Sequence, residues 1–371
     1  MEWRNKVVSK VAAYGIAAFC VGYFASYVPY SMLTKMLTSG ILPGMDGKGY
    51  SGFVIQPLVV TASTFAFYLF LTAAGWWRYA TRWNCFGWSL PRPRWFTFLA
   101  GICTSGIIIT TTLAYSFEGI SIVFAMLLMR GGVLALAPIV DLIAVKRKRK
   151  IYWPSWVAAT LSFGALFVSI SSRTSLAMTV VATVDIVLYL ACYFLRLYFM
   201  SSWAKSRDLD EMKRFFTEDQ MTANAVVWVG VMATALFGAT ASPQSIPGEL
   251  WRGLVEFPFL GHNLAAIGIG IGSCGAGIFG SLIFLDRREN TFTVPANRVS
   301  SVIAGVIATY CLAFFFGSKY PGANELIGVA LIVLAIIFLA YRTLVEKRIV
   351  KVVQTDPATG VDAAGEAAGT T

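Results

Sequence analysis

The stretch 120-ISIVFAMLLMRGGVLALAPIVDLIAV-145 decides the fold class. Apart from one arginine and one aspartate it is apolar, and at 1.5 Å per residue it is long enough to cross the ~30 Å hydrocarbon layer of a bilayer. An arginine within such a segment costs at least about 2.5 kcal/mol on insertion scales. The stretch therefore predicts a membrane-spanning helix in which Arg130 faces a polar cavity or a partner rather than lipid.

The composition extends this reading to the whole chain. Of 371 residues, 57% are hydrophobic and only 13% charged, whereas about a quarter of the residues in an average soluble protein are charged. Apolar runs of similar length recur along the sequence. We therefore predict an all-α polytopic membrane protein with ten transmembrane helices, at residues 9–36, 53–77, 95–116, 120–145, 155–172, 176–200, 220–240, 262–285, 291–317 and 322–343.

The placement of the charges predicts the orientation. If the N-terminus lies inside, 22 of the 30 Lys and Arg residues fall on the inner side, 4 fall in outer loops and the other 4 lie within spans. The positive-inside rule then places both termini in the cytoplasm. The net charge of +11 thus reflects membrane topology and not nucleic-acid binding, and the run 146-KRKRK-150 is interpreted as an orientation anchor. We expect a bacterial inner (cell) membrane, although an organellar membrane would give the same charge pattern.

Few residues are suited to catalysis or to metal binding. The six cysteines have no metal-ligand spacing, and the only histidine is His262. We therefore expect no cofactor, no metal and no enzymatic activity. The formal GxGxxG match in 268-GIGIGSCGAGIFG-280 lies inside a predicted span, so a dinucleotide site is rejected. Instead, the small residues recurring every fourth position, at Gly268, Gly272, Ala276 and Gly280, predict a face for close helix packing.

The ten spans divide into two halves. When the sequence is shifted by 168 residues, the first five spans overlay the last five in order, and Arg130 falls on Arg298. Because five is odd, the second half enters the membrane from the opposite side. The sequence thus predicts two inverted five-helix repeats, at residues 1–172 and 173–343, followed by a cytoplasmic tail at 344–371 that we expect to be disordered. Inverted repeats are a recurring architecture of secondary transporters, whose sites lie at the repeat interface.

Candidate binding residues follow from the same spans. Arg130 lies about 15 Å deep and Arg298 about 10 Å deep at 1.5 Å per residue, so a two-fold axis in the membrane plane brings both to one central cavity. One helical face carries Asp185, Tyr189 and Tyr193, and Ser301 shares a face with Arg298. In an alternative interpretation, Asp185 pairs with one arginine and simply joins two helices.

The last two predicted spans carry a family resemblance. The segment 291-TFTVPANRVSSVIAGVIATYCLAFFFGSKYPGANELIGVALIVLAIIFLAY-341 resembles the corresponding spans of the drug/metabolite transporter superfamily, both its nucleotide-sugar and sugar-phosphate translocators and its EamA-like carriers. In the nucleotide-sugar transporters an Asn-Lys pair near the start of this span helps to hold the nucleotide. The resemblance implies the same role for Asn297 and Arg298.

These observations predict a secondary active transporter, in which alternating access through a central cavity moves a small organic anion. A phosphate- or nucleotide-containing substrate is favoured, because paired guanidinium groups suit such anions. Arg130 and Arg298 are expected to hold the anion, Asp185 to pair with an arginine of the empty site, and aromatic rings to pack on the substrate, at Tyr27, Tyr189 and Tyr193.

Two other functions remain open at this stage. One is an EamA-like exporter of amino acids, amines or drugs coupled to protons, in which the arginines are structural. The other is a membrane-embedded enzyme, which the single histidine disfavours. The expected partners are a small-molecule substrate and membrane lipids, with no nucleic acid, and the sequence leaves open whether the chain forms a homodimer.

Overall fold

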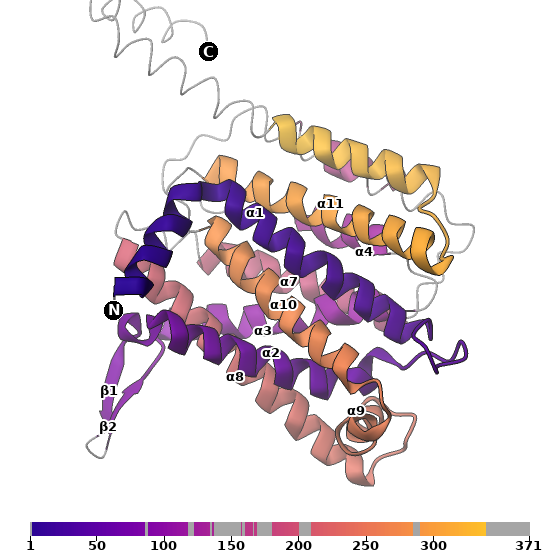
Figure 1. The fold of residues 1–371 in the computed structure, drawn as a ribbon, viewed down its shortest axis with the longest axis horizontal. Coiled ribbons are helices and arrows are strands. Elements are labelled where there is room, and N and C mark those ends of the chain that lie inside the picture. The colour runs from indigo at the N-terminus through magenta and orange to yellow at the C-terminus, as the bar shows by residue number, and fades with distance from the viewer. Residues whose placement is uncertain are drawn as a thin grey trace, which may run out of the picture.

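Helices make up nearly all of the described chain (Figure 1). The structure is a computed structural model that describes residues 2–85, 88–117, 122–133, 180–199, 209–284 and 290–338, together with 136, 157, 160–165 and 167–168. Its longer helices are α1 (Glu2–Thr38), α2 (Gly52–Ala74), α3 (Trp95–Ser116), α7 (Val180–Phe199), α8 (Leu209–Phe237), α10 (Asn263–Phe284) and α11 (Asn290–Phe316). Shorter elements are α4 (Ile122–Met126), α9 (Ile246–Val255), the 3₁₀ turns η1 (Trp76–Tyr79), η5 (Gly238–Thr240) and η6 (Phe257–Phe259), the π-helical turn η2 (Leu127–Gly131), and a helix over Ala323–Phe338.

The helices are those of a membrane protein. Within the described residues, five helices are long and apolar enough to cross a bilayer: Gly52–Ala74, Trp95–Tyr115, Val180–Phe199, Asp210–Thr240 and Asn263–Ile283. Large apolar side chains such as Phe65, Val180 and Leu236 are exposed on their outer surfaces, as expected where lipid replaces water. The predicted class, an all-α membrane protein, is thus confirmed in its coarse form. The number of ten spans, the two inverted repeats and the cytoplasmic termini remain predictions.

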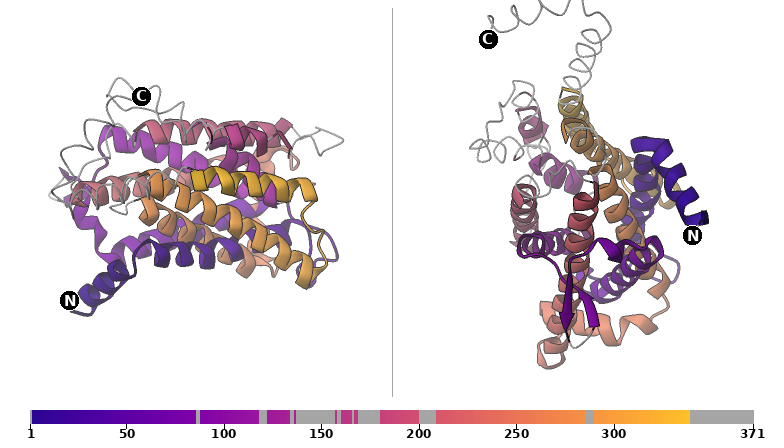
Figure 2. Two further views of the ribbon diagram at one scale, coloured as in Figure 1. Left: turned by 90° about the horizontal axis from the view of Figure 1, so that it is seen from above. Right: turned by 90° about the vertical axis from the view of Figure 1, so that its left-hand side faces the viewer.

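The helices pack as one bundle in which the N-terminal helices interleave with the C-terminal ones (Figures 1 and 2). α1 runs against α10 and α11, and α2 packs between α10 and α8. α3 packs against α7 and α8, while α4 contacts α11. Segments far apart in the sequence therefore surround the same interior.

Local sequence signals set the ends of α2. Ser51 precedes the helix, and its hydroxyl accepts a hydrogen bond from the backbone N–H of Phe53, which satisfies one of the free donors of the first turn. At the other end Gly75 adopts a left-handed conformation with φ of 67°, and its N–H bonds to the carbonyls of Leu71 and Thr72. A left-handed glycine is the usual residue at such a helix end.

The predicted small-residue face of α10 is confirmed. A side chain at Gly268, Gly272 or Gly280 would meet Leu33, Tyr30 or Tyr23, respectively, at 2.9–3.2 Å, and all three belong to α1. The glycines therefore let α1 and α10 approach closely along most of their length, as small residues do between membrane helices.

Two features of the fold were not predicted. The loop between α2 and α3 forms a two-stranded antiparallel hairpin, β1 (Arg82–Cys85) and β2 (Trp88–Pro91). At the opposite end of the bundle the connection after α8 folds into the short helix α9, which packs on α2 and α8. Both segments lack the long apolar runs on which the span prediction depended.

Several sequence predictions concern residues outside the described ranges. They are the aspartate of the fourth predicted span, Asp141, the basic run 146–150 and the tail 344–371.

The close contact between α10 and α2 gives a prediction. A Cβ at Gly270 would lie 2.5 Å from the carbonyl oxygen of Val59 and 2.7 Å from the Cβ of Ala62, whereas a Cβ at Gly277 meets nothing within 4 Å. We expect Gly270→Ala to lower the apparent Tm in detergent, because overpacking costs roughly 1–3 kcal/mol. Gly277→Ala should leave the Tm unchanged or raise it, since alanine favours a helix by about 1 kcal/mol. Equal melting temperatures for the two variants would contradict this packing.

Candidate functional site

A central cavity of about 110 Å³ lies where the long helices meet. Residues from α1, α2, α3, α7, α8, α10, α11 and η2 line it. The polar lining includes Ser63, Thr104, Thr111, Gln220, Asn224 and Asn297, and the charged lining is Arg130 and Arg196. Of the residues predicted from the sequence, Tyr27, Arg130, Tyr193 and Asn297 line the cavity, whereas Asp185, Tyr189, Arg298 and Ser301 lie outside its lining.

Arg130 is buried at the cavity and held by two tyrosines. Its Nη1 donates to the hydroxyl of Tyr189 at 2.9 Å and its Nη2 to the hydroxyl of Tyr27 at 3.1 Å. Its Nε has no hydrogen-bond partner. The arginine lies on the π-helical turn η2, and such turns occur mostly as single insertions within α-helices, frequently at functional sites. Neutral hydroxyls thus orient the guanidinium without neutralising its charge.

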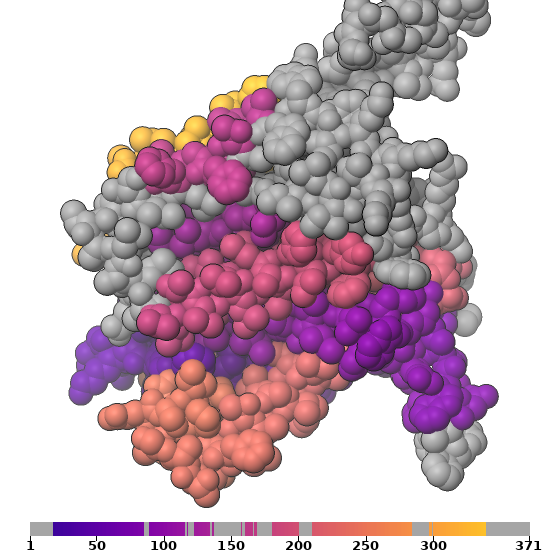
Figure 3. Space-filling model, turned by 180° about the vertical axis from the view of Figure 1, so that it is seen from behind, coloured from indigo at the N-terminus to yellow at the C-terminus, as the bar shows by residue number. Residues whose placement is uncertain are grey.

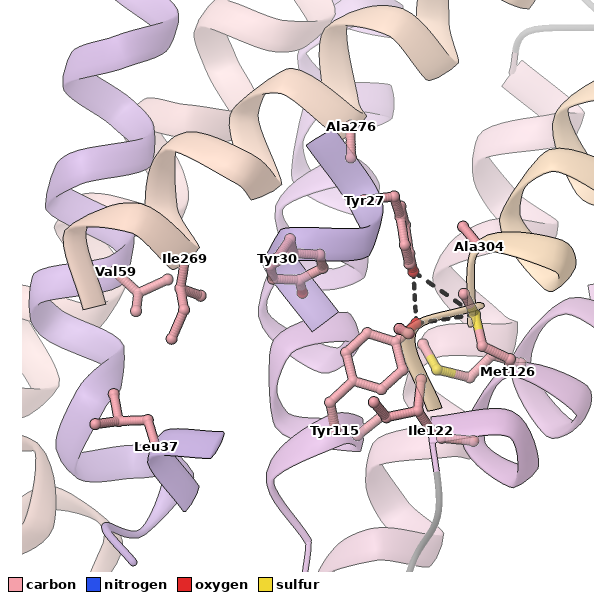
Figure 4. Close-up of a cluster of buried hydrophobic side chains, with 14 of the residues drawn as sticks. Tyr27, Tyr30, Leu37, Val59, Tyr115, Ile122, Met126, Ile269, Ala276 and Ala304 are labelled. Carbon is pink, nitrogen blue, oxygen red and sulfur yellow. Dashed lines mark hydrogen bonds between the residues drawn. The ribbon is translucent and has the colours of Figure 1, made fainter. Parts of the chain in front are cut away.

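Buried tyrosines lie close to Tyr27, one of the two partners of Arg130 (Figure 4). The hydroxyls of Tyr27 and Tyr115 are 2.5 Å apart, and the Tyr115 hydroxyl donates to the sulfur of Met126 at 3.0 Å. The hydroxyl of Tyr30 bonds to that of Thr112 at 3.0 Å. These contacts fix the ring of Tyr27, which is itself a partner of Arg130. The sequence reading singled out only Tyr27, although the spacing of Tyr23, Tyr27 and Tyr30 on α1 already places all three on one helical face.

Arg298 is completely buried, with 0% of its surface exposed. Its guanidinium carbon lies 4.5 Å from the centre of the Tyr193 ring, and among the described residues none of its three side-chain nitrogens has a hydrogen-bond partner. Tyr193 lines the cavity and Arg298 does not, so the tyrosine ring contacts both the cation and the cavity. A cation–π contact offsets part of the desolvation of the charge but supplies no counter-charge.

The neighbours of Arg298 in the sequence serve mainly to position α11. Asn297 donates to the carbonyl of Gly280 on α10 at 3.3 Å, and the Ser301 hydroxyl donates to the backbone carbonyl of Arg298 at 2.8 Å. Asn297 also lines the cavity, so its amide remains within reach of a ligand. Ser301 uses its hydrogen on its own helix and lies away from the cavity.

Asp185 is not paired with either arginine. The side chain is buried on α7, and its Oδ2 has no hydrogen-bond partner. Among the ion pairs of the described residues, none joins Asp185 to Arg130 or Arg298. The interpretation in which Asp185 joins two helices through an arginine, and the expectation that it pairs with one in the empty site, therefore find no support in this conformation.

A buried ion pair that the sequence reading missed closes another side of the cavity. Arg196 of α7 donates from Nη2 to Oδ2 of Asp219 on α8 at 2.9 Å, and Thr104 of α3 donates to Oδ1 of the same carboxylate at 2.8 Å. The predicted seventh span began at residue 220, which left Asp219 in a cytoplasmic linker. In the structure α8 begins at Leu209 and continues through Asp219, so most of this segment is helix continuous with the predicted span. The charges of its first turns hid the helix from a hydropathy criterion.

The adjacent residue, Glu218, has a structural role. Its carboxylate is fully buried and accepts hydrogen bonds from Thr81, Arg94 and Thr97, which tie α8 to the hairpin and to the start of α3. A carboxylate satisfied in this way stabilises the fold and has no capacity left for a ligand.

Comparison with known proteins adds little to this picture. No protein-family model matches the chain, and no curated protein matches it. A solved structure described as "Crystal structure of protein" is similar, with a TM-score of 0.49 and 16% sequence identity over 90% of this chain and 99% of that chain. Membership of the drug/metabolite transporter superfamily therefore remains a prediction from the sequence.

The Arg196–Asp219 pair can be tested by a mutant cycle. Asp219→Asn should lower the free energy of unfolding by roughly 3–5 kcal/mol, because it leaves a buried guanidinium without its counter-charge. Adding Arg196→Gln should recover much of this loss. The matched control is Glu256→Gln, which breaks the exposed Arg252–Glu256 pair and should cost less than about 1 kcal/mol. Thermal unfolding of the wild type, the two single variants, the double variant and the control measures the effect, and additive losses in the double variant would contradict the assignment.

Proposed function

We propose that the protein is a secondary active transporter that moves a small organic anion through the central cavity. The observation that carries this proposal is the pair of buried guanidinium groups, Arg130 and Arg298, with no carboxylate within 4.0 Å among the ion pairs of the described residues. A buried arginine in a membrane protein is a candidate functional residue by default. The missing counter-charge is supplied by the substrate.

The two arginines have different roles in this account. Arg130 lines the cavity, and Tyr27 and Tyr189 already hold its guanidinium in place, so an entering phosphate or carboxylate meets an oriented donor. Arg298 lies behind the ring of Tyr193. When that ring turns aside, the second guanidinium reaches the same anion. Amide and hydroxyl groups of the lining, such as Gln220, are left to bind the uncharged part of the substrate.

The packing pattern supports the inverted repeat on which alternating access depends. If the second half repeats the first, the first span corresponds to the sixth, the second to the seventh and the third to the eighth. A contact between the first and eighth spans then predicts a contact between the sixth and third. The corresponding contacts, α1 with α10 and α7 with α3, both occur. The same exchange relates α2–α10 to α8–α3, which are also in contact. Arg130 and Arg298 are the matching residues of the two halves, as expected at a repeat interface.

The buried charge further suggests that transport is an exchange. An empty carrier would have to carry two guanidinium groups without counter-ions through the change of conformation. An occupied carrier avoids this desolvation cost, because the anion neutralises them. Return of the protein to the other side therefore requires a second anion.

The cavity size bears on the substrate. Pockets that hold drug-sized ligands measure roughly 300–1,000 Å³, and the present cavity is about 110 Å³. This conformation suits a small anion, and a nucleotide-sized one requires a wider state. One observation favours the second candidate function, a proton-coupled exporter of amino acids, amines or drugs. It is the buried and unpaired Oδ2 of Asp185, a group able to take up a proton or to meet an amine.

A thermal-shift panel distinguishes the two functions. A ligand that binds the folded state raises the apparent Tm, so small phosphorylated compounds and carboxylates should stabilise the purified protein, and amines should not. Arg298→Gln should abolish the stabilisation, and Arg130→Gln should weaken it at least tenfold in apparent affinity if one charged contact of about 1.5–3 kcal/mol is lost. Arg252→Gln, an exposed arginine of α9, is the control. Stabilisation by amines that persists in Arg298→Gln and disappears in Asp185→Asn would favour the exporter.

A further inference from the structure

The hairpin between α2 and α3 has two chemically different faces. In an antiparallel pair, directly opposed residues lie on the same face, and neighbours along a strand alternate. Trp83 is opposite Leu90, whereas Asn84 is opposite Ser89. One face therefore carries the large apolar pair Trp83 and Leu90, and the other carries Asn84 and Ser89.

The apolar face has no covering within the described structure. Trp83 is 52% exposed and Leu90 is 49% exposed. The Trp83 ring contacts the guanidinium group of Arg92, whose carbon lies 5.4 Å from the ring centre. Near the hairpin base Trp95 is 73% exposed as well. An isolated two-stranded hairpin is marginally stable at best in water, so a face of this kind calls for a partner.

The surrounding charge indicates the partner. Arg92 lies over the Trp83 ring on the apolar face, Arg82 is on the opposite face with Ser89, and Arg78 precedes the strands. None of the three forms an ion pair among the described residues. Arg82 donates to the Ser89 hydroxyl at 3.3 Å and Arg78 to the Tyr79 hydroxyl at 2.7 Å, which are neutral acceptors. By contrast, Arg94 at the start of α3 is neutralised by Glu211 and Glu218.

The position of the hairpin restricts what can cover it. It joins two helices that are each long enough to span a bilayer, so it lies at the membrane surface. It extends sideways from the end of the bundle, across the helix axes and clear of the other helices (Figures 1 and 3). The view along the bundle shows the same direction (Figure 2). A segment that projects in this way overlies the lipid around the protein.

We propose that this hairpin is a docking element for the surface of an anionic phospholipid leaflet. Trp83 and Leu90 enter the headgroup layer, where tryptophan is favoured. Arg92, on the same face, and Arg78, before the strands, bind phosphates and other anionic headgroup oxygens, since juxtamembrane basic residues are attracted to anionic lipid. This inference rests on the membrane-spanning fold and not on the identity of the transported substrate.

The hairpin is also connected to the interior of the protein through hydrogen bonds to α8. Thr81, directly before β1, binds Glu218 through its backbone N–H at 3.0 Å and its hydroxyl at 2.6 Å. The next residue of α8, Asp219, holds Arg196 at the cavity. The hairpin therefore holds the part of α8 that carries Glu218 and Asp219. Lipid contact at the hairpin restrains the same helix.

Adjacent residues on opposite faces provide the test. In a Cys85→Ser background, a dye whose fluorescence depends on its exposure to water is attached to the new cysteine of Leu90→Cys or of Ser89→Cys. The signal of the background protein without an added cysteine is subtracted. The full-length proteins are studied in detergent, in phosphatidylcholine vesicles and in vesicles that also contain phosphatidylglycerol, with iodide as quencher. We expect the dye at position 90 to be protected several-fold more than the dye at position 89, and only in the anionic vesicles.

Charge variants complete the experiment. Arg78→Gln and Arg92→Gln should each lower the ratio of protected to accessible dye about fivefold, as expected for roughly one cation–headgroup attraction lost. Arg82→Gln, on the polar face, should have a smaller effect. Arg252→Gln, in α9 at the opposite end of the bundle, should have no effect. Protection that persists in detergent would mean that protein covers the face and would overturn the proposal. Equal accessibility at the two positions, or no dependence on anionic lipid, would overturn it too. The readout uses no transported ligand, so it is independent of whether the anion-carrier proposal succeeds.

Discussion

A guanidinium group inside a membrane protein needs either a counter-charge or a polar route to water, and this constraint organises the whole interior. The protein meets it in two ways. Arg196 has a full partner in Asp219, supported by Thr104. Within the described part of the chain, the contacts of Arg130 and Arg298 are with tyrosine hydroxyls and rings. The difference separates a charge that stabilises the fold from charges that await a ligand.

The second arrangement is costly unless it is used. An uncompensated ion in a medium of low dielectric constant loses several kcal/mol of hydration even after local relaxation, and tyrosine contacts recover only part of this. The same donors become strong anion-binding groups once a phosphate or carboxylate enters, because charge-assisted hydrogen bonds are about twice as strong as neutral ones. The free-energy cost of desolvating the guanidinium groups is therefore already present in the empty site, and an entering anion gains affinity because it need not supply that cost.

The sequence predicted the features that depend on local composition. Apolar runs located most helices, the glycines of α10 predicted its packing on α1, and the isolated arginines predicted buried cations. The placement of Asp219 could not be predicted, because the charges at the start of α8 resemble those of a cytoplasmic linker. The π-helical turn at Arg130 and the ring of Tyr193 over Arg298 also depend on tertiary packing, which hydropathy and helical spacing do not contain. The hairpin was not predicted, because its strands are only four residues long.

The central claim is that the empty carrier cannot change its conformation with two buried guanidinium groups uncompensated. The most direct measurement is the efflux of a labelled anion, chosen from the compounds that stabilise the protein, out of proteoliposomes. We expect rapid efflux when the same anion is present outside and almost no efflux into anion-free buffer. The exchange should be lost in Arg298→Gln. Equal efflux into the two buffers would show that the empty protein returns freely, and it would contradict the role assigned to Arg130 and Arg298.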